Sequence, residues 1–243
     1  MSSKPHILIL IPTYNNAGTL ADVVTRSLAS GLPVLVVDDG STDDTSAVLS
    51  SFSGQSGLSV IRHPLNQGKG CALKTGFRAA REMGYPYVIT LDADGQHFPE
   101  DIPALLEACG ENTLVVGSRG MRGVSAGSSF ANRFSNFWFT LYTSVKLPDT
   151  QTGFRLYPLT RLPGLWLLSA RYEAELTLLV FSAWKGLRLV PVPVRVAYPE
   201  DRVSHFRPFR DFSRISILNC ILLPMALLYG YPRMLLRKLF VKA

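Results

Sequence analysis

Short apolar runs alternate along the chain with segments whose apolar residues recur every three or four positions. The first pattern is typical of buried strands, and the second is typical of amphipathic helices. The predicted strands are 6–11, 33–37, 58–62, 87–91 and 113–117. The predicted helices between them are 17–29, 43–51, 70–83 and 100–108. This alternation predicts an α/β fold with a mostly parallel sheet and helices on both of its faces.

The pattern changes after residue 118. Residues 117–129 are rich in Gly and Ser, which predicts a loop. Residues 130–145 and 171–185 have helical spacing, and the first of these two segments is rich in aromatic residues. Residues 187–196 read as a strand, and because Pro191 and Pro193 cannot donate ladder hydrogen bonds, we expect it at a sheet edge.

Polar motifs follow three of the predicted strands. They are Pro-Thr-Tyr-Asn-Asn at 12–16, Asp-Asp-Gly-Ser at 38–41 and Asp-Ala-Asp at 92–94. Ligands of parallel α/β sheets bind at the carboxyl ends of the strands. The three motifs therefore predict one ligand site at this edge.

Asp92 and Asp94 form a pair of carboxylates that can reach one hard cation. Mg²⁺ suits such a site, because phosphate oxygens complete its coordination where the protein supplies few ligands. A calcium loop does not fit, since Pro103 stands where the closing Glu is required. The alternative is a solvated turn, and the neighbouring motifs argue against it.

Asp38 and Asp39 end the second predicted strand. One interpretation makes this segment a helix start, with Ser41 or Thr42 as the N-cap. It leaves both carboxylates unexplained, whereas a carboxylate that faces a nucleobase accepts a hydrogen bond from uracil or guanine.

A glycine-rich segment, Asn-Gln-Gly-Lys-Gly at 66–70, precedes a predicted helix. It is not a Walker A loop, because His63 stands where the first glycine is required. Glycines with Lys69 at a helix N-terminus suit a phosphate group. The alternative is a turn that carries a surface lysine.

The amino-acid composition excludes some classes of protein and some kinds of site. The 243 residues are 47% hydrophobic and 18% charged, which excludes an intrinsically disordered chain. Cys71, Cys109 and Cys220 form no CxxC pair, so they indicate a reducing compartment without a metal–thiolate site. The first apolar run is too short for an export signal, and we expect the protein on the cytoplasmic side.

The net charge of +7 comes entirely from the end of the chain. Residues 1–201 contain 17 basic and 17 acidic residues, whereas residues 202–243 contain 8 basic residues and one acidic residue. A neutral body argues against nucleic-acid binding, and a basic apolar tail argues for an anionic membrane surface. The apolar run 215–231 would make a helix of roughly 25 Å, shorter than a bilayer core of ~30 Å. We expect it to be interfacial or re-entrant; the alternative is a core helix.

The order and spacing of these motifs resemble family-2 glycosyltransferases. The branch that is most similar contains dolichol-phosphate mannose synthases and bacterial polyprenyl-phosphate glycosyltransferases. Further matches are Gly117-Ser118-Arg119, Asp149, Gly153-Phe154-Arg155, Tyr172-Glu173-Ala174-Glu175, Val190-Pro191-Val192-Pro193 and 202–206. The resemblance implies a GT-A fold over 1–210, with a nucleotide-sugar half at 1–118 and an acceptor half at 119–210. A basic apolar helical tail at 211–243 follows.

The resemblance also implies roles for individual residues. The nucleotide would be bound by Pro12, Tyr14, Asp38, Asp39, Lys69 and Asp92. Mg²⁺ or Mn²⁺ would be bound by Asp92, Asp94 and Gln96. The acceptor phosphate would be bound by Arg119, Arg133, Arg202, His205 and Arg207. The catalytic residues would be Asp94 and Glu175.

The implied activity is a metal-dependent, inverting sugar transfer from a UDP- or GDP-sugar to a polyprenyl- or dolichyl-phosphate-like lipid. It would take place at the cytoplasmic face of a membrane, with the enzyme attached peripherally. An ionised phosphate acceptor needs no strong general base, whereas a hydroxyl acceptor needs one. The candidates for that base are Glu175, Glu173 and Asp149, although Glu173 and Glu175 could instead form surface ion pairs.

Two departures from the family's pattern keep other acceptors open. His205 replaces a lysine of the family, and Phe137 replaces a polar residue one helical turn after Arg133. The first alternative is the same fold acting on a hydroxyl of a lipid or glycan. The second is an inactive scaffold that binds a nucleotide-sugar.

Overall fold

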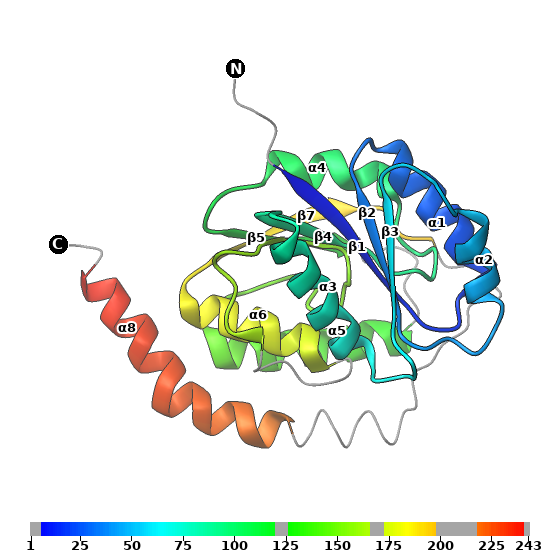
Figure 1. Ribbon diagram of the computed structural model, residues 1–243. Helices are drawn as coiled ribbons and strands as arrows, with labels where there is room; N and C mark the ends of the chain where they lie inside the picture. The colour runs from blue at the N-terminus through cyan, green and yellow to red at the C-terminus, as the bar shows by residue number, and fades with distance from the viewer. Residues whose placement is uncertain (1–5, 120–125, 166–172, 198–217, 241–243) are drawn as a thin grey trace.

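A single mixed sheet forms the centre of the protein (Figure 1). The computed structural model describes residues 6–119, 126–165, 173–197 and 218–240. Within them the strand order is β3-β2-β1-β4-β6-β5-β7. The strands are β1 (Ile7–Thr13), β2 (Val34–Asp38), β3 (Leu58–Arg62), β4 (Tyr87–Thr90), β5 (Thr113–Arg119), β6 (Arg155–Pro158) and β7 (Arg188–Val194). Neighbouring strands are parallel except at β6, which is antiparallel to β4 and β5, so the predicted mostly parallel α/β fold is confirmed.

Helices connect the strands where the spacing predicted them. They are α1 (Ala17–Ala29), α2 (Thr45–Ser51), α3 (Lys69–Glu82), α4 (Ile102–Glu107), α5 (Ala126–Thr143) and α6 (Glu173–Lys185). A short 3₁₀ turn, η1 (Pro99–Asp101), precedes α4. The end of the chain is helical at 218–225, continues through the π-helical turn η3 (Ala226–Gly230) and ends in α8 (Tyr231–Phe240).

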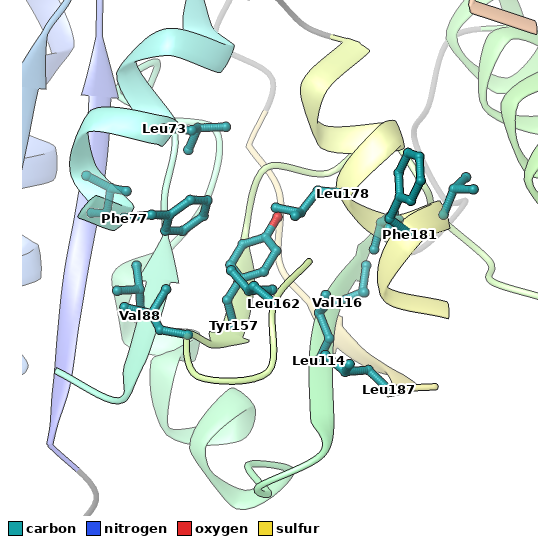
Figure 2. Close-up of a cluster of buried hydrophobic side chains, with 14 of the residues drawn as sticks. Leu73, Phe77, Val88, Leu114, Val116, Tyr157, Leu162, Leu178, Phe181 and Leu187 are labelled. Atoms are coloured by element: carbon teal, nitrogen blue, oxygen red, sulfur yellow. The ribbon is translucent and has the colours of Figure 1, made fainter. Parts of the chain in front are cut away.

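The two faces of the sheet bury separate hydrophobic clusters. Along β1, Leu8 and Leu10 belong to one cluster, whereas Ile9 and its odd-numbered neighbours belong to the other. This alternation follows from the two-residue period of a strand. Helices α3, α5 and α6 cover the first face, and α1, α2 and α4 cover the second. Figure 2 shows side chains of α3 and α6 in the cluster on the first face.

Two sequence-based expectations differ from the structure, and a third is confirmed. Strand β6 was not predicted, because four residues that begin with Arg155 and end with Pro158 are too short to show a period. The loop predicted at 117–129 is wrong at both ends: β5 continues to Arg119 and α5 begins at Ala126. The edge position of β7 is confirmed.

The C-terminal helical segment lies against α5 and α6 (Figure 1). Leu222 and Ala226 are fully buried in the first cluster, and Asn219 accepts a hydrogen bond from the Tyr142 hydroxyl at 2.8 Å. Gly230 lies so close to Trp184 that a Cβ there would collide with the indole. One side of the segment therefore belongs to the core. No helix in the described residues is both long and apolar enough to cross a membrane.

Candidate active site

The sheet register brings the polar motifs together at one edge. Thr13, the last residue of β1, pairs with Asp38, the last residue of β2, and Asp92 follows β4 on the other side of β1. Pro12 is buried within β1, and Tyr14 is half-buried directly after it. The predicted convergence of these motifs on the carboxyl edge follows from the parallel pairing of β1, β2 and β4.

Lys69 links two acidic side chains that are far apart in the sequence. Its Nζ lies 2.7 Å from Oδ1 of Asp92 and 2.8 Å from Oε2 of Glu175. Lys69 is the first residue of α3, and Glu175 lies in the first turn of α6. The alternative for Glu175, a surface ion pair, is wrong, because its side chain is buried and faces Lys69.

The ion pair fixes the protonation of Lys69 and Asp92. Burial by itself would lower the pKa of Lys69, but the carboxylates of Asp92 and Glu175 outweigh it and raise that pKa above its usual value. Burial likewise opposes the ionisation of Asp92, yet the Lys69 ammonium lowers its pKa. At neutral pH, Lys69 is therefore a cation and Asp92 an anion.

Backbone contacts hold the Asp92–Asp94 segment in place. The Thr19 hydroxyl donates to the Ala93 carbonyl at 2.6 Å, and the Gln96 amide donates to Oδ1 of Asp94 at 3.0 Å. Gly153 faces Asp92 without a side chain, and a Cβ there would collide with the carboxylate. The loop is thus built to keep the Asp92 carboxylate in one position.

The donor set fits a divalent cation that shares its coordination with phosphate. No group of three or more His, Cys, Asp or Glu side chains arranged to hold a metal occurs in the described residues. Asp92 and Asp94 are both only half-buried. Two carboxylates with phosphate oxygens match the usual Mg²⁺ site, which keeps few protein ligands. Gln96 is buried beside them, and its predicted metal contact stays a prediction.

Asp38 and Asp39 are both buried and both bonded within the protein. Asp38 accepts from the Ser41 amide at 2.9 Å and lies 3.3 Å from Nε of Arg62. Asp39 accepts from the amides of Gln67 and Gly68. Its Oδ1 also lies 2.7 Å from Nδ1 of His63. These bonds tie the glycine-rich segment before α3 to the end of β2. Contact of either carboxylate with a nucleobase stays a prediction.

The expected N-cap of α2 is wrong. The helix begins at Thr45, and the side chain that accepts from its amide is Asp43 at 3.0 Å. The Ser41 hydroxyl instead accepts from the amide of Asn15, and the Thr42 amide donates to the Asn15 side chain. Both hydroxyl residues therefore hold the segment after β1 rather than the helix.

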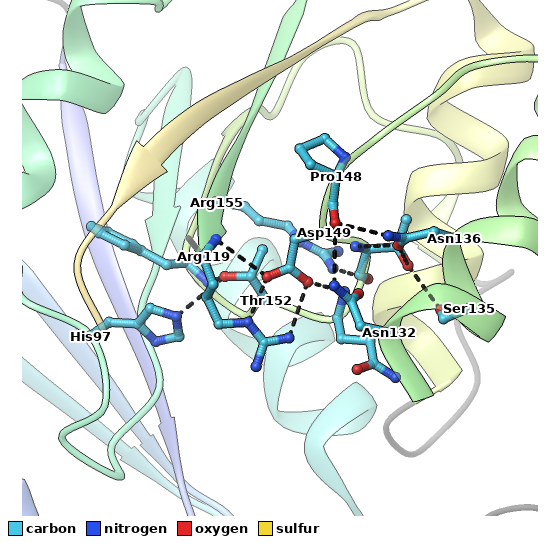
Figure 3. A network of polar contacts seen from close by, with 12 residues as sticks. His97, Arg119, Asn132, Ser135, Asn136, Pro148, Asp149, Thr152 and Arg155 are labelled. Carbon is cyan, nitrogen blue, oxygen red and sulfur yellow. Dashed lines mark hydrogen bonds and ion pairs between the residues drawn. The ribbon is translucent and has the colours of Figure 1, made fainter. Parts of the chain in front are cut away.

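Arg119 is paired with a fully buried carboxylate (Figure 3). Its Nε lies 2.5 Å from Oδ2 of Asp149, and its Nη2 lies 3.1 Å from Oδ1. Asp149 also accepts from the Gln151 amide at 3.0 Å. This bidentate geometry orients the guanidinium at the end of β5. It disfavours Asp149 as a general base, because both of its oxygens are engaged.

Helix α5 holds the loop that carries Asp149 (Figure 3). The Asn136 side chain donates to the Pro148 carbonyl at 2.8 Å and accepts from the Thr150 amide at 3.1 Å. Arg133 is exposed on the same helix, and so is Phe137, which is 61% exposed. An exposed aromatic ring therefore lies one helical turn from the exposed guanidinium, and contact of Arg133 with a phosphate stays a prediction.

Arg155 was noted in a motif but given no role from the sequence. It is fully buried, and its guanidinium donates to the carbonyls of Glu175 at 2.8 Å and Thr150 at 2.9 Å. It therefore fastens the first turn of α6 to the loop that carries Asp149. The one available signal was a charged residue next to Phe154 in an otherwise apolar segment, which does not reveal its partners.

His97 packs beside the site. It is buried, its Nε2 lies 3.3 Å from the Thr152 hydroxyl, and its ring contacts Phe154. Burial lowers its pKa, so it is neutral at pH 7. Glu173 is half-buried at the start of α6. The predicted phosphate ligands Arg202, His205 and Arg207 lie outside the described residues.

Comparison with known proteins identifies the family. Residues 8–161 match Glycosyl transferase family 2, which is more than half of the chain. The chain is a family-2 glycosyltransferase. This glycosyltransferase is 33% identical over 200 residues to the undecaprenyl-phosphate mannosyltransferase of Micrococcus luteus, covering 77% of this chain and 82% of the relative.

A second relative and one solved structure extend the comparison. The glycosyltransferase is 28% identical to the UDP-N-acetylglucosamine–dolichyl-phosphate N-acetylglucosaminyltransferase of Methanococcus voltae, covering 88% of this chain and 96% of the relative. It also resembles glucosyl-3-phosphoglycerate synthase from Mycobacterium tuberculosis in complex with Mn²⁺, UDP and phosphoglyceric acid. The TM-score is 0.63 at 22% identity, covering 91% of this chain and 78% of that one. The implied GT-A fold is confirmed.

Proposed function

We propose that this enzyme transfers a sugar from a UDP- or GDP-sugar to the phosphate of a polyprenyl-phosphate-like lipid. The observation that carries the proposal is the convergence of Asp92, Asp94 and Lys69 at the carboxyl edge of the sheet, beside Glu175. The names of the two relatives, which describe transfer to undecaprenyl and dolichyl phosphate, support the choice of acceptor.

The residues at the sheet edge would bind the donor, and those of the acceptor half would bind the lipid phosphate. Lys69 and the glycine-rich segment before α3 attract the donor diphosphate, since the start of a helix favours anions. Asp92, Asp94 and Gln96 would hold Mg²⁺ or Mn²⁺. When bound, the cation would neutralise negative charge that develops on the leaving nucleoside diphosphate.

The acceptor half orients an anionic nucleophile. Asp149 and the loop around it fix the Arg119 guanidinium, and Arg133 adds an exposed positive charge on α5. An ionised phosphate oxygen attacks the anomeric carbon in line with the departing diphosphate, with inversion. It needs no general base, because it has no proton to lose at neutral pH.

A hydroxyl acceptor is the second candidate, and one observation favours it. Oε1 of Glu175 is buried and has no hydrogen-bond partner in the described residues, so it could accept a proton. Glu175→Gln separates the two candidates while it keeps a polar contact to Lys69. We expect a loss of turnover below about tenfold for a phosphate acceptor, and about 100-fold or more where a base is needed.

We also propose that the C-terminal helical segment docks the enzyme on an anionic membrane. Its outer side exposes several large apolar residues: Ile221, Leu223, Leu227, Leu228, Tyr229, Leu235, Leu236 and Leu239. Arg233 and Arg237 are exposed among them. Apolar side chains with interspersed cations suit the boundary between headgroups and acyl chains.

A transfer assay in detergent tests the proposed reaction. The purified protein is incubated with Mn²⁺ or Mg²⁺, a panel of labelled UDP- and GDP-sugars, and undecaprenyl phosphate. We expect label in the lipid phase only when the lipid phosphate and the metal are both present. Metal-dependent nucleotide binding without label transfer would favour the hydroxyl acceptor. Absence of binding by any nucleotide would exclude both reactions and the nucleotide-sugar-binding scaffold, and would leave the family relationship as common ancestry without activity.

A further inference from the structure

The Lys69 ammonium occupies a carboxylate oxygen of the proposed cation site. It lies 2.7 Å from Oδ1 of Asp92, which is ion-pair contact with no room for another atom between them. The side chains are largely shielded from water, with 17% of Lys69, 24% of Asp92 and 9% of Glu175 exposed. Solvent therefore screens the group weakly, and the position of each charge affects the other two.

The local charge balance explains why a lysine can hold this place. Asp92 and Glu175 together carry two negative charges, and the Lys69 ammonium between them carries one positive charge. A divalent cation that approached Asp92 would meet the ammonium at the same oxygen, and the two positive charges would repel each other. For the cation to bind fully, Lys69 must give up its contact with Asp92.

Lys69 has a second anchor and a flexible side chain. Glu175 still holds the ammonium when the Asp92 contact is lost, since the two carboxylates contact the same nitrogen. A four-carbon stem allows the ammonium to move. A nucleoside diphosphate at this sheet edge would offer it new anionic partners and so compensate for the lost contact.

We propose that Lys69 competes with the divalent cation for Asp92, so that metal and nucleoside diphosphate bind cooperatively. The metal alone binds weakly, because it must displace the ammonium. The diphosphate draws Lys69 away and strengthens metal binding, and the metal strengthens nucleotide binding by the same factor. This inference rests on the proposed function for the place of the nucleotide and the metal.

The test measures Mn²⁺ binding by electron paramagnetic resonance, with and without UDP or GDP. For the wild-type protein we expect the nucleotide to lower the Mn²⁺ dissociation constant at least tenfold. Lys69→Met should bind Mn²⁺ alone at least tenfold more tightly than the wild type, with a smaller effect of nucleotide. Mn²⁺ alone should also raise the Tm of Lys69→Met more than that of the wild type.

Three further variants serve as controls. Lys69→Arg retains the positive charge, so the binding of Mn²⁺ alone should stay as weak as in the wild type. Lys74→Met removes a positive charge from the same helix, and because Lys74 makes no ion pair among the described residues, Mn²⁺ binding should not change. Among the described residues, Glu175→Gln leaves Asp92 as the only anion in contact with Lys69, so Mn²⁺ alone should bind more weakly than to the wild type. This variant keeps the test decisive if Lys69→Met does not fold.

The results separate this inference from the proposed function. Cooperative binding in the wild type with no tighter Mn²⁺ binding by Lys69→Met would overturn the competition and leave the proposed function standing. Equal Mn²⁺ affinity of the wild type and Glu175→Gln would overturn it as well. If no form bound Mn²⁺ with either nucleotide, the metal assignment and the competition would both fail.

Discussion

Two regions of the molecule reverse the usual distribution of polar and apolar residues. At the carboxyl edge of the sheet, Asp38, Asp39, Asp149 and Arg155 are fully or almost fully buried. Along the C-terminal helical segment, by contrast, leucines such as Leu228, which is 82% exposed, face outward. Buried polar groups and exposed apolar patches are the informative exceptions in a soluble fold.

The two regions differ in whether their exceptional residues find partners within the described part of the protein. The buried charges are matched by hydrogen-bond partners within the protein: the carboxylates accept from amides and a guanidinium, and Arg155 donates to a carbonyl. The exposed parts of the outward leucines contribute free energy only when another apolar surface covers them. The first region therefore agrees with the proposed anionic ligand, and the second agrees with the proposed lipid surface.

The largest expected effect is a loss of turnover when a carboxylate of the proposed cation site is removed from the polar region. Asp94→Ala should reduce turnover about 100- to 1000-fold, because charge stabilisation of the leaving diphosphate is lost. Steady-state transfer rates and the Tm check this. Asp22→Ala, which removes a carboxylate that is 64% exposed on α1, is the matched control. A fully active Asp94→Ala protein would remove this carboxylate from the proposed metal site.

A smaller effect tests the rigidity of the same region. Gly153→Ala should displace the Asp92 carboxylate and reduce turnover about 10- to 100-fold, since misplacement by about 1 Å is costly. Gly18→Ala is the control, because a Cβ at Gly18 has open space around it. If Gly153→Ala retained normal turnover and metal affinity, the position of Asp92 would tolerate more movement than the structure suggests.

The apolar region is tested by removing one outward leucine. Leu228→Ser should weaken binding to vesicles of phosphatidylglycerol about tenfold, which corresponds to about 1.4 kcal/mol of lost apolar burial. Co-sedimentation measures the change. Leu65→Ser removes another exposed leucine from the nucleotide half and should leave vesicle binding unchanged. Equal weakening by both variants would contradict a specific docking face.

The smallest expected effect is on the free energy of unfolding, and it comes from an exposed ion pair rather than from the buried charges. Glu100 contacts Arg26 in a bidentate pair, and the Arg26 guanidinium lowers the pKa of Glu100 from 4.5 to about 2. Glu100→Gln should lower the free energy of unfolding by about 0.5 kcal/mol at pH 7, as exposed pairs usually do.

The pH dependence of this small effect has a definite sign. Because the pKa of Glu100 is lower in the folded protein, its contribution is present above pH 4.5 and disappears as the pH falls towards 2. Urea unfolding at pH 7 and at pH 3 should show the difference between wild type and Glu100→Gln shrinking. A difference that stayed constant between these pH values would exclude the ion pair as its source.

Much of the site was predictable because its residues lie close to strand ends. Asp92 and Asp94 follow a recognisable apolar strand, and parallel pairing then fixes their edge of the sheet. The partners of these residues were not predictable in the same way. Glu175 lies more than one hundred positions from Lys69, and no local pattern relates the two residues.

In the acceptor half, too, the partners of the site residues could not be predicted from the sequence. The sequence placed Arg119 just after the fifth predicted strand, but it did not show that the strand includes this residue or that Asp149 pairs with it. Strand β6, which places Arg155 between the two halves of the site, was too short to be recognised. The pairing of this strand depends on β4 and β5, which flank it, rather than on its own four residues.

The amino-acid sequence alone was sufficient to predict the α/β alternation, the sheet edge that carries the polar motifs, and the basic apolar end of the chain. These features depend on local periodicity and composition, which each segment carries within itself. The folded protein was needed to show that Lys69 is shared between Asp92 and Glu175 and that Asp149 is sequestered by Arg119. The free energy of a charge depends on its burial and on its neighbours, and here those neighbours come from distant parts of the chain.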